Sequence, residues 1–389
     1  MNISKNKIVY ALALLAVAFI MKFVLVKFLS IENNLWLNLV EIILIMVIGA
    51  NFVLKGAANI IEETTEVLSE KTKIASGVLQ SIGTGFPDVA FGVTAAMASL
   101  SLAKSDYVSS MNFAIIAAST AFGSNIYNIG HATWCVWRQN KSNSLDKSLN
   151  MFPFLPRFGK VKPFHKHKIE PTFKEFDVAN DIVLALTVLT AIVASSMVLF
   201  GRVQNPVSGG GDMYEMVKPV GLAIFIASIV LMYIFRKVQR PTEGTAEIEG
   251  ETKYFRKQKL IVIWTCLFLS GVAILLAADS MVRALELFSE LTKIPVVITG
   301  VLTGVISCLG EMIVVHNFSV NPQGRIGDAI VGVAMDNIVT TMAASIVAML
   351  GGIFLGGNAL IIIFVIVLSM NTGLMWQISK LKNYYLKTT

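Results

Sequence analysis

The chain has 389 residues, of which 55% are hydrophobic and only 15% are charged, and its mean hydropathy is +0.69. A soluble domain carries roughly 25% charged residues, so this composition excludes an ordinary soluble enzyme and indicates an all-α polytopic membrane protein. The net charge of +7 lies in the loops between apolar blocks, where basic residues set orientation. It therefore gives no reason to expect nucleic-acid binding.

Apolar blocks of about twenty residues, the length that crosses the hydrocarbon core, predict about ten transmembrane helices. An alternative for the first block is a cleaved signal peptide, because Lys5 and Lys7 precede its apolar run. The predicted spans are residues 8–28, 36–58, 75–101, 108–136, 180–201, 217–236, 258–280, 294–320, 326–350 and 357–378.

The loops between these spans alternate in basic content. Loop 137–179 and linker 237–257 are rich in Lys and Arg, whereas the intervening loops are poor. The positive-inside rule then predicts a multi-pass protein of the cell membrane with both termini in the cytoplasm. His165 and His167 are flanked by lysines, which repel a cation. We therefore interpret loop 137–179 as a solvated connector that also touches anionic lipid, in preference to a metal site.

An acidic residue occurs inside an apolar stretch twice, in nearly the same sequence. Residues 78–88 read VLQSIGTGFPD and residues 301–311 read VLTGVISCLGE, so that Asp88 and Glu311 match. An ionised acid at the centre of a bilayer helix costs about 3 kcal/mol. Two such acids cost about 6 kcal/mol unless a cation compensates them, and this predicts a buried cation site.

The two acids fall in the third and eighth predicted spans, which are five spans apart. Because five is odd, the two copies must cross the membrane in opposite directions. Inverted repeats with a site at their midplane interface are a recurrent transporter architecture. A further likeness supports the repeat, since residues 69–74 (SEKTKI) resemble residues 289–294 (SELTKI).

The residues around each acid are hard oxygen ligands. Thr84 and Ser307 each precede their acid by four residues, so a helix places hydroxyl and carboxylate on one face. Pro87 lacks a backbone donor and frees a carbonyl one turn earlier. Such oxygens suit calcium, sodium or a proton, and do not suit a soft transition metal.

A second polar segment follows each acid, and it contains Asn125 in the fourth span and Asp336-Asn337 in the ninth. Asn125 is a candidate ligand, with helix–helix hydrogen bonding as the alternative. Asp336 is a third intramembrane acid, with a structural hydrogen bond or a position near the cytoplasm as the alternative. Cys135, Cys266 and Cys308 show no disulfide or zinc spacing.

At these residues the chain resembles the cation/calcium exchanger superfamily, which includes sodium/calcium exchangers. The family's core, Gly-Thr-Ser-x-Pro-Glu, is similar to residues 83–88, and its Gly-Ser-Asn-x-x-Asn stretch is intact at residues 123–128. The resemblance implies two inverted repeats and a set of metal ligands. That set has Asp88 and Glu311 at its centre, Thr84 and Ser307 beside them, and Asn125 and Asn337 at the sides.

The chain departs from the family pattern in ways that bear on its ions. Asp88 replaces a Glu, Gly85 and Cys308 replace serines, Gly310 replaces a proline, and Asp336 stands where the second repeat usually has Ser. The lost hydroxyls leave the coupling ion open between Na⁺ and H⁺. We keep Asp336 among the candidate metal ligands.

The expected function is antiport of Ca²⁺ against Na⁺ or H⁺ by alternating access between two facing carboxylates. The alternatives are transport of another divalent cation and a non-transporting membrane interaction protein. We expect no enzyme activity and no cofactor, with inorganic cations and the lipid bilayer as partners. The predicted organisation is 1–35 extra span or signal anchor, 36–136 first repeat core, 137–179 basic loop, 180–236 two spans, 237–257 linker and 258–389 second repeat.

Overall fold

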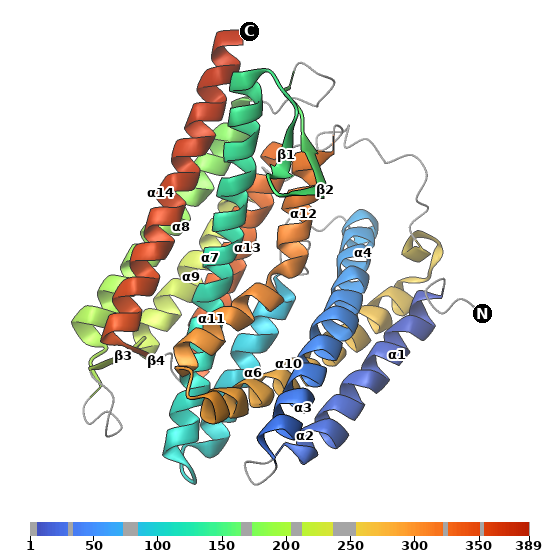
Figure 1. The fold of residues 1–389 in the computed structure, drawn as a ribbon, viewed down its shortest axis with the longest axis vertical. Coiled ribbons are helices and arrows are strands. Elements are labelled where there is room, and N and C mark those ends of the chain that lie inside the picture. Colours follow the sequence, from blue (N-terminus) through green and yellow to red (C-terminus); the bar gives the residue numbers. More distant parts are fainter. Residues whose placement is uncertain are drawn as a thin grey trace.

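The computed structural model describes residues 6–29, 34–72, 85–164, 173–203, 212–235, 254–321, 326–350 and 354–388. Within these ranges long helices lie side by side in one bundle, with a small two-stranded sheet at either end (Figure 1). The first half holds α1 (Lys7–Ile20), the π-helical η2 (Met21–Leu25), α2 (Val26–Phe28), α3 (Leu35–Val47), the π-helical η3 (Ile48–Leu54), α4 (Lys55–Thr72), α6 (Phe86–Leu102), α7 (Tyr107–Leu145) and α8 (Phe173–Phe200). The second half holds α9 (Lys218–Phe235), the short 3₁₀ turn η4 (Tyr254–Lys257), α10 (Leu260–Thr292), α11 (Val296–Ser307), α12 (Leu309–Val320), α13 (Ile326–Leu350) and α14 (Gly357–Thr388).

The helices of the described chain include seven that are long and apolar enough to cross a membrane, or up to eight if the bent pair α11–α12 is one span. Each of the ten predicted blocks falls on a helix or a broken helix, so an all-α polytopic membrane protein is confirmed. Two predicted blocks, which fall on α6 and α7, are not among these candidate spans. Residues 73–84, before α6, lie outside the described residues, and α7 carries many buried Ser, Thr and Asn side chains.

Helix α1 is part of the bundle. It packs against α10 and α4, and it buries Ala11, Leu14 and Ala18 completely. Its N-terminus is capped by Asn6, whose side chain accepts hydrogen bonds from the amides of the first turn. Whether this first span is retained or cleaved stays a prediction.

Helix α7 is the central element of the bundle, and it packs against α6, α11, α13 and α14. It has 39 residues, which corresponds to about 58 Å of helix and exceeds the roughly 30 Å hydrocarbon core. Asp106 caps its start, and it ends at Asp146 in the left-handed conformation. Helix α7 is therefore longer than the hydrocarbon core is thick.

Helices α6 and α12, which have the two acids in their first turns, run in opposite directions. α6 ends at Leu102, just before α7 begins. α12 ends at Val320, which lies against Gly159 in a segment that follows the other end of α7. The two half-helices therefore point toward opposite ends of the bundle (Figure 1), as the odd number of intervening spans predicts.

The predicted loop 137–179 is wrong in its first part, because α7 continues to Leu145 and a β-hairpin follows. β1 (Leu149–Phe152) pairs antiparallel with β2 (Leu155–Val161), and a second small sheet pairs β3 (Met213–Glu215) with β4 (Phe354–Gly356). Polar residues that suggested a solvated loop are buried against the hairpin. Gln139, for example, donates to the carbonyl of Lys162 at 2.9 Å.

Several predictions on loops fall outside the described residues. These are the two histidines at 165 and 167, and residues 237–253 of the linker. The predicted domain boundaries and the cytoplasmic position of the termini stay predictions.

Candidate cation site

Asp88 lies in the first turn of α6, which begins at Phe86 after Gly85. Pro87 occupies the first turn, where a helix leaves backbone N–H groups unpaired and a missing donor costs nothing. The amide of Val89 already donates to the carbonyl of Gly85 at 3.2 Å. A helix N-terminus carries a partial positive charge, so this placement favours the Asp88 carboxylate.

Glu311 lies in the equivalent position of α12, although its copy of the motif has no proline. The helix breaks instead at Cys308, with φ −94° and ψ 5°, and α11 and α12 are bent by 53°. The amide of Met312 donates to the carbonyl of Cys308 at 3.0 Å. Both acids therefore begin a half-helix, and both benefit from its N-terminal charge.

Glycines bring α7 against α11 at the level of the site. A Cβ on Gly304 would lie 2.5 Å from the amide nitrogen of Ser124, and one on Gly123 would lie 2.9 Å from the Val301 carbonyl oxygen. Thr120 also donates to the carbonyl of Gly300 at 3.2 Å. Small residues let membrane helices approach backbone to backbone. Here they press the Gly-Ser-Asn segment of α7 onto the motif that contains Glu311.

Asp88 is 1% exposed and is surrounded by hydroxyl groups. Thr340 of α13 donates to its Oδ2 at 3.2 Å, and Ser124 and Ser307 also hydrogen-bond it. Each of these hydroxyls has a backbone carbonyl of its own helix within 3.1 Å as a second acceptor. A hydroxyl that turns its proton to that carbonyl presents its lone pairs to a cation.

Glu311 is 2% exposed and is surrounded by amides and acids. Asn128 donates through Nδ2 to its Oε2, and the same Nδ2 lies 3.5 Å from Oδ1 of Asn337. The charges of Asp336 and Asp88 both act on Glu311. The two copies thus meet at one buried site, which the central helix α7 and helix α13 complete.

Four oxygen atoms at this site are buried and have no hydrogen-bond partner among the described residues. They are Oδ1 of Asp88, Oε1 of Glu311, and Oδ1 of Asn125 and Asn128. A buried polar atom without a partner is costly. Oxygens of carboxylate, amide and hydroxyl groups are the ligands that Ca²⁺ takes, in sets of six to eight.

The predicted site residues are largely found together. Ser307, Asn337 and Asp336 contact or act on one of the two acids, and Asn125 is buried one helical turn before Asn128. Thr84 lies outside the described residues. Within the described ranges no three His, Cys, Asp or Glu side chains form a metal cluster, so a cation here needs amide and hydroxyl oxygens as well.

Three polar residues of the site were not predicted as ligands, namely Asn128, Ser124 and Thr340. Their signal was present in the sequence. Asn128 is the last residue of the Gly-Ser-Asn-x-x-Asn stretch, three residues after Asn125 and so on the same helix face. Thr340 follows Asp336 by four residues, which places it one turn further along α13.

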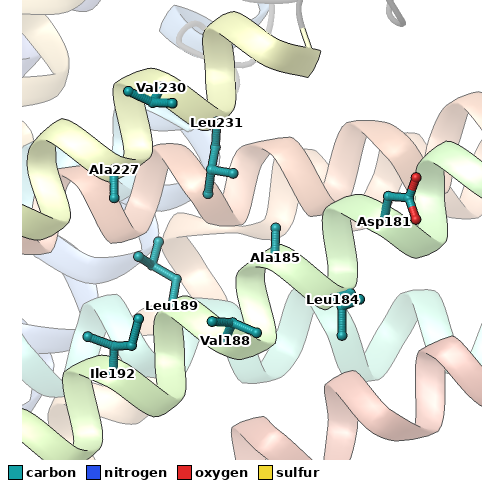
Figure 2. A pocket seen from close by; sticks show the side chains of 9 residues that line it. All are labelled: Asp181, Leu184, Ala185, Val188, Leu189, Ile192, Ala227, Val230 and Leu231. Atoms are coloured by element: carbon teal, nitrogen blue, oxygen red, sulfur yellow. The ribbon is translucent and has the colours of Figure 1, made fainter.

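A groove of 480 Å³ lies elsewhere, between α8 and α9 (Figure 2). Its lining is aliphatic apart from Asp181, and Leu184, Val188 and Ile192 are about half exposed there. Both helices are candidate membrane spans. An apolar outward face is what a lipid-facing surface requires, and the groove takes no part in the acid site.

The sequence matches no family model and no curated protein. The structure is similar to that of the H⁺/Ca²⁺ exchanger CAX, with a TM-score of 0.59, 12% sequence identity, and coverage of 97% of this chain and 88% of that chain. This chain has the fold of that exchanger. It is also similar to the sodium-calcium exchanger NCX_Mj, with a TM-score of 0.47, 15% identity, and coverage of 91% and 98%. The likeness to CAX confirms, at the level of the fold, the resemblance that the motifs indicated, in an integral multi-pass membrane protein.

Proposed function

We propose that this chain is an antiporter that moves Ca²⁺ in exchange for Na⁺ or H⁺, with Asp88 and Glu311 as its central ligands. One observation carries the proposal. Two buried acids from oppositely directed half-helices share one site, and each keeps one carboxylate oxygen without a hydrogen-bond partner. The fold shared with an H⁺/Ca²⁺ exchanger supports the same function.

The charge of the site explains why the ions exchange. Two carboxylates without a counter-charge are very unfavourable in a low-dielectric interior. One Ca²⁺ neutralises both, as do two monovalent cations, and the same oxygens cannot hold both sets at once. The ions therefore compete. If the bundle rearranges only when the site is neutralised, exchange becomes obligatory.

The direction of the half-helices fits alternating access. In transporters built from inverted repeats, discontinuous helices meet at the midplane, and one part rocks against the other around the fixed site. Here α6 and α12 begin at the site and extend to opposite ends of the bundle. Motion of either half-helix would open the site toward one side.

The test is ⁴⁵Ca flux in proteoliposomes under an imposed Na⁺ gradient or an imposed pH gradient. Asp88→Asn and Glu311→Gln should each abolish flux, because each variant removes one of the two central carboxylates that bind the divalent cation. Asp181→Asn is the matched control, since Asp181 is an exposed acid at the groove between α8 and α9. Flux like that of the unmutated protein in both site variants would refute the assignment.

A second candidate, transport of a softer divalent cation, rests on two sulfur atoms. Cys308 Sγ lies 3.7 Å from Met312 Sδ, and the thiol interacts electrostatically with both acids. Sulfur ligands select softer metals. Cd²⁺ should then inhibit ⁴⁵Ca flux about tenfold less effectively in Cys308→Ser than in the unmutated protein. Cys266→Ser, a buried cysteine of α10, is the control, and equal inhibition in all three proteins would exclude this candidate.

The remaining alternative is a non-transporting membrane interaction protein. It predicts no flux under either gradient and no thermal stabilisation by any of the cations. A transporter should instead be stabilised by each cation that it binds, by about 2.7 kcal/mol at a concentration one hundred times the dissociation constant. Thermal unfolding in detergent with and without Ca²⁺ separates the two.

A further inference from the structure

The β1–β2 hairpin has one face on the protein and one face free in the described structure. On its inner face Phe152 stacks on His316 of α12 at 5.8 Å and on Trp134 of α7 at 6.2 Å. The His316 ring nitrogen also contacts the carbonyl oxygen of Phe158 at 2.8 Å. The hairpin therefore packs against α12, the helix that has Glu311 in its first turn.

A glycine in β2 allows the hairpin to lie close to α12. Gly159 has φ +87°, a conformation that L side chains rarely adopt, and a Cβ there would lie 3.1 Å from the side chain of Val320. Trp134 Nε1 donates to the carbonyl of Met151 at 3.1 Å, and Arg138 donates to the carbonyl of Asn150. The hairpin thus connects the ends of α7 and α12.

The exposed side chains of the hairpin are both apolar and basic. Phe154 at the turn is 93% exposed, and Leu155 is 45% exposed. Arg157 and Lys160 of β2 are exposed, and Arg157 lies 5.1 Å from the centre of the Phe158 ring. Residues 147–164 contain no acid. A surface of this kind is complementary to anionic lipid headgroups above an apolar layer.

The depth of the hairpin points to the same partner. Trp134 lies nine residues beyond Asn125 on α7, which is about 14 Å along the helix, and half the hydrocarbon core is about 15 Å. If the proposed cation site lies at the midplane, Trp134 is at the membrane interface, where Trp is enriched. The hairpin folds back along α7 from Ser142, which donates to the Val161 carbonyl, toward Trp134. Its turn therefore points back along α7, away from the end of that helix (Figure 1).

We propose that the exposed surface of the β1–β2 hairpin docks on an anionic lipid surface, with Phe154 in the apolar layer and Arg157 and Lys160 at the headgroups. Its inner face then links that lipid contact to α12 and so to Glu311. The depth argument rests on the proposed function, because it takes the cation site as the midplane. The contact surface itself rests on exposure and charge.

The experiment is to attach a spin label to Phe154→Cys and measure its accessibility to oxygen and to a water-soluble nickel complex in nanodiscs. The three native cysteines are fully buried, so the introduced thiol reacts selectively. With phosphatidylglycerol present the label should be accessible to oxygen and protected from nickel. Leu145→Cys, half exposed at the end of α7, is the control and should stay accessible to nickel.

The basic residues are tested in the same assay. Arg157→Gln with Lys160→Gln should shift the docking equilibrium by about 30-fold toward the undocked state in phosphatidylglycerol. Removing two exposed lysines distant from the hairpin, Lys104→Gln with Lys218→Gln, should leave it unchanged. A label at residue 154 that is as nickel-accessible as the control in every lipid overturns the proposal, and so does one shielded from both probes by a protein partner.

Failure of this proposal is distinguishable from failure of the proposed function. The spin-label measurement does not depend on transport. Absent flux with a docked hairpin refutes the antiporter alone, and intact flux with an undocked hairpin refutes the lipid contact alone.

Discussion

The two half-helices that begin at the acids reach the same geometry by different sequences. α6 begins with Gly85 and Pro87, two residues that disfavour a continuous helix. The second copy has no proline, and its break spans Cys308 to Gly310, between the helical segments Val296–Ser307 and Glu311–Val320. The difference teaches that the break is maintained by tertiary contacts as well as by local sequence, because α11 is pressed against α7 at Gly300 and Gly304.

The partners of the two acids also differ. Asp88 has hydrogen bonds from three hydroxyls, whereas Glu311 has one from an amide and lies near a further acid, Asp336. Asp88 therefore has more hydrogen-bond donors around it than Glu311 has. We expect the Glu311 side to depend more strongly on a bound cation and to respond more strongly to substitution.

The contact between α7 and α11 gives the largest expected effect. Gly304→Ala places a Cβ 2.5 Å from the backbone nitrogen of Ser124, and overpacking of this kind costs about 1–3 kcal/mol or more. We expect a lower melting temperature and loss of flux. Gly332→Ala is the control, because nothing lies within 4 Å of its Cβ, and thermal unfolding should show it unchanged or stabilised. Equal melting temperatures for both variants would show that the break in the second copy does not depend on this contact.

The sequence predicted the general arrangement of the two half-helices but not the details of the fold around them. The matched acids and the span count predicted the inverted half-helices. The segment from Val296 to Ser307 contains no proline to mark the 53° bend that follows it. Its contact with α7 at Gly300 and Gly304 joins residues nearly two hundred positions apart, which local sequence does not reveal. The hairpin was missed because the polar residues after 137 were assigned to a loop, whereas in the fold Gln139 and Asn143 hydrogen-bond the backbone of Lys162 and Phe164, just after β2.

The donors of the two acids give the next largest effect. Asn128→Leu removes the side-chain amide that donates to Glu311, whereas Thr340→Val leaves Asp88 with Ser124 and Ser307. A hydrogen bond to a charged group contributes about 1.5–3 kcal/mol. Asn128→Leu should therefore weaken Ca²⁺ binding by roughly tenfold to a hundredfold, and Thr340→Val by less. Titration of purified protein with Ca²⁺ compares them, and a stronger effect of Thr340→Val would reverse the ranking of the two sides.

Asp336 tests the same difference between the Asp88 and Glu311 sides of the site through its charge. It is 6% exposed on α13, and its charge acts on Glu311. Because the number of ligand charges tunes Ca²⁺ affinity, Asp336→Asn should weaken Ca²⁺ binding by about tenfold. It should also change the net charge moved per Ca²⁺, which current recordings alongside ⁴⁵Ca flux would measure. An unchanged ratio of current to flux would assign Asp336 a structural role.

The smallest effect is expected at the start of α7, remote from both acids. Asp106 caps this helix, accepting from the Ser109 amide at 3.1 Å and from its hydroxyl at 2.8 Å, and the Ser109 hydrogen bonds lower the pKa of Asp106 below its ordinary value of 3.8. Because the folded pKa is depressed, this stabilisation is present above pH 3.8 and is lost as the pH falls through the folded value. Asp106→Ala should lower the melting temperature at pH 7 by roughly 2 °C, and Asp106→Asn, which still caps, should lower it less. Since neither variant touches the site, Ca²⁺ affinity should be unchanged in both. A change in affinity would mean that α7 transmits strain from its first turn to Asn125 and Asn128, and that the start and the middle of this helix do not act independently.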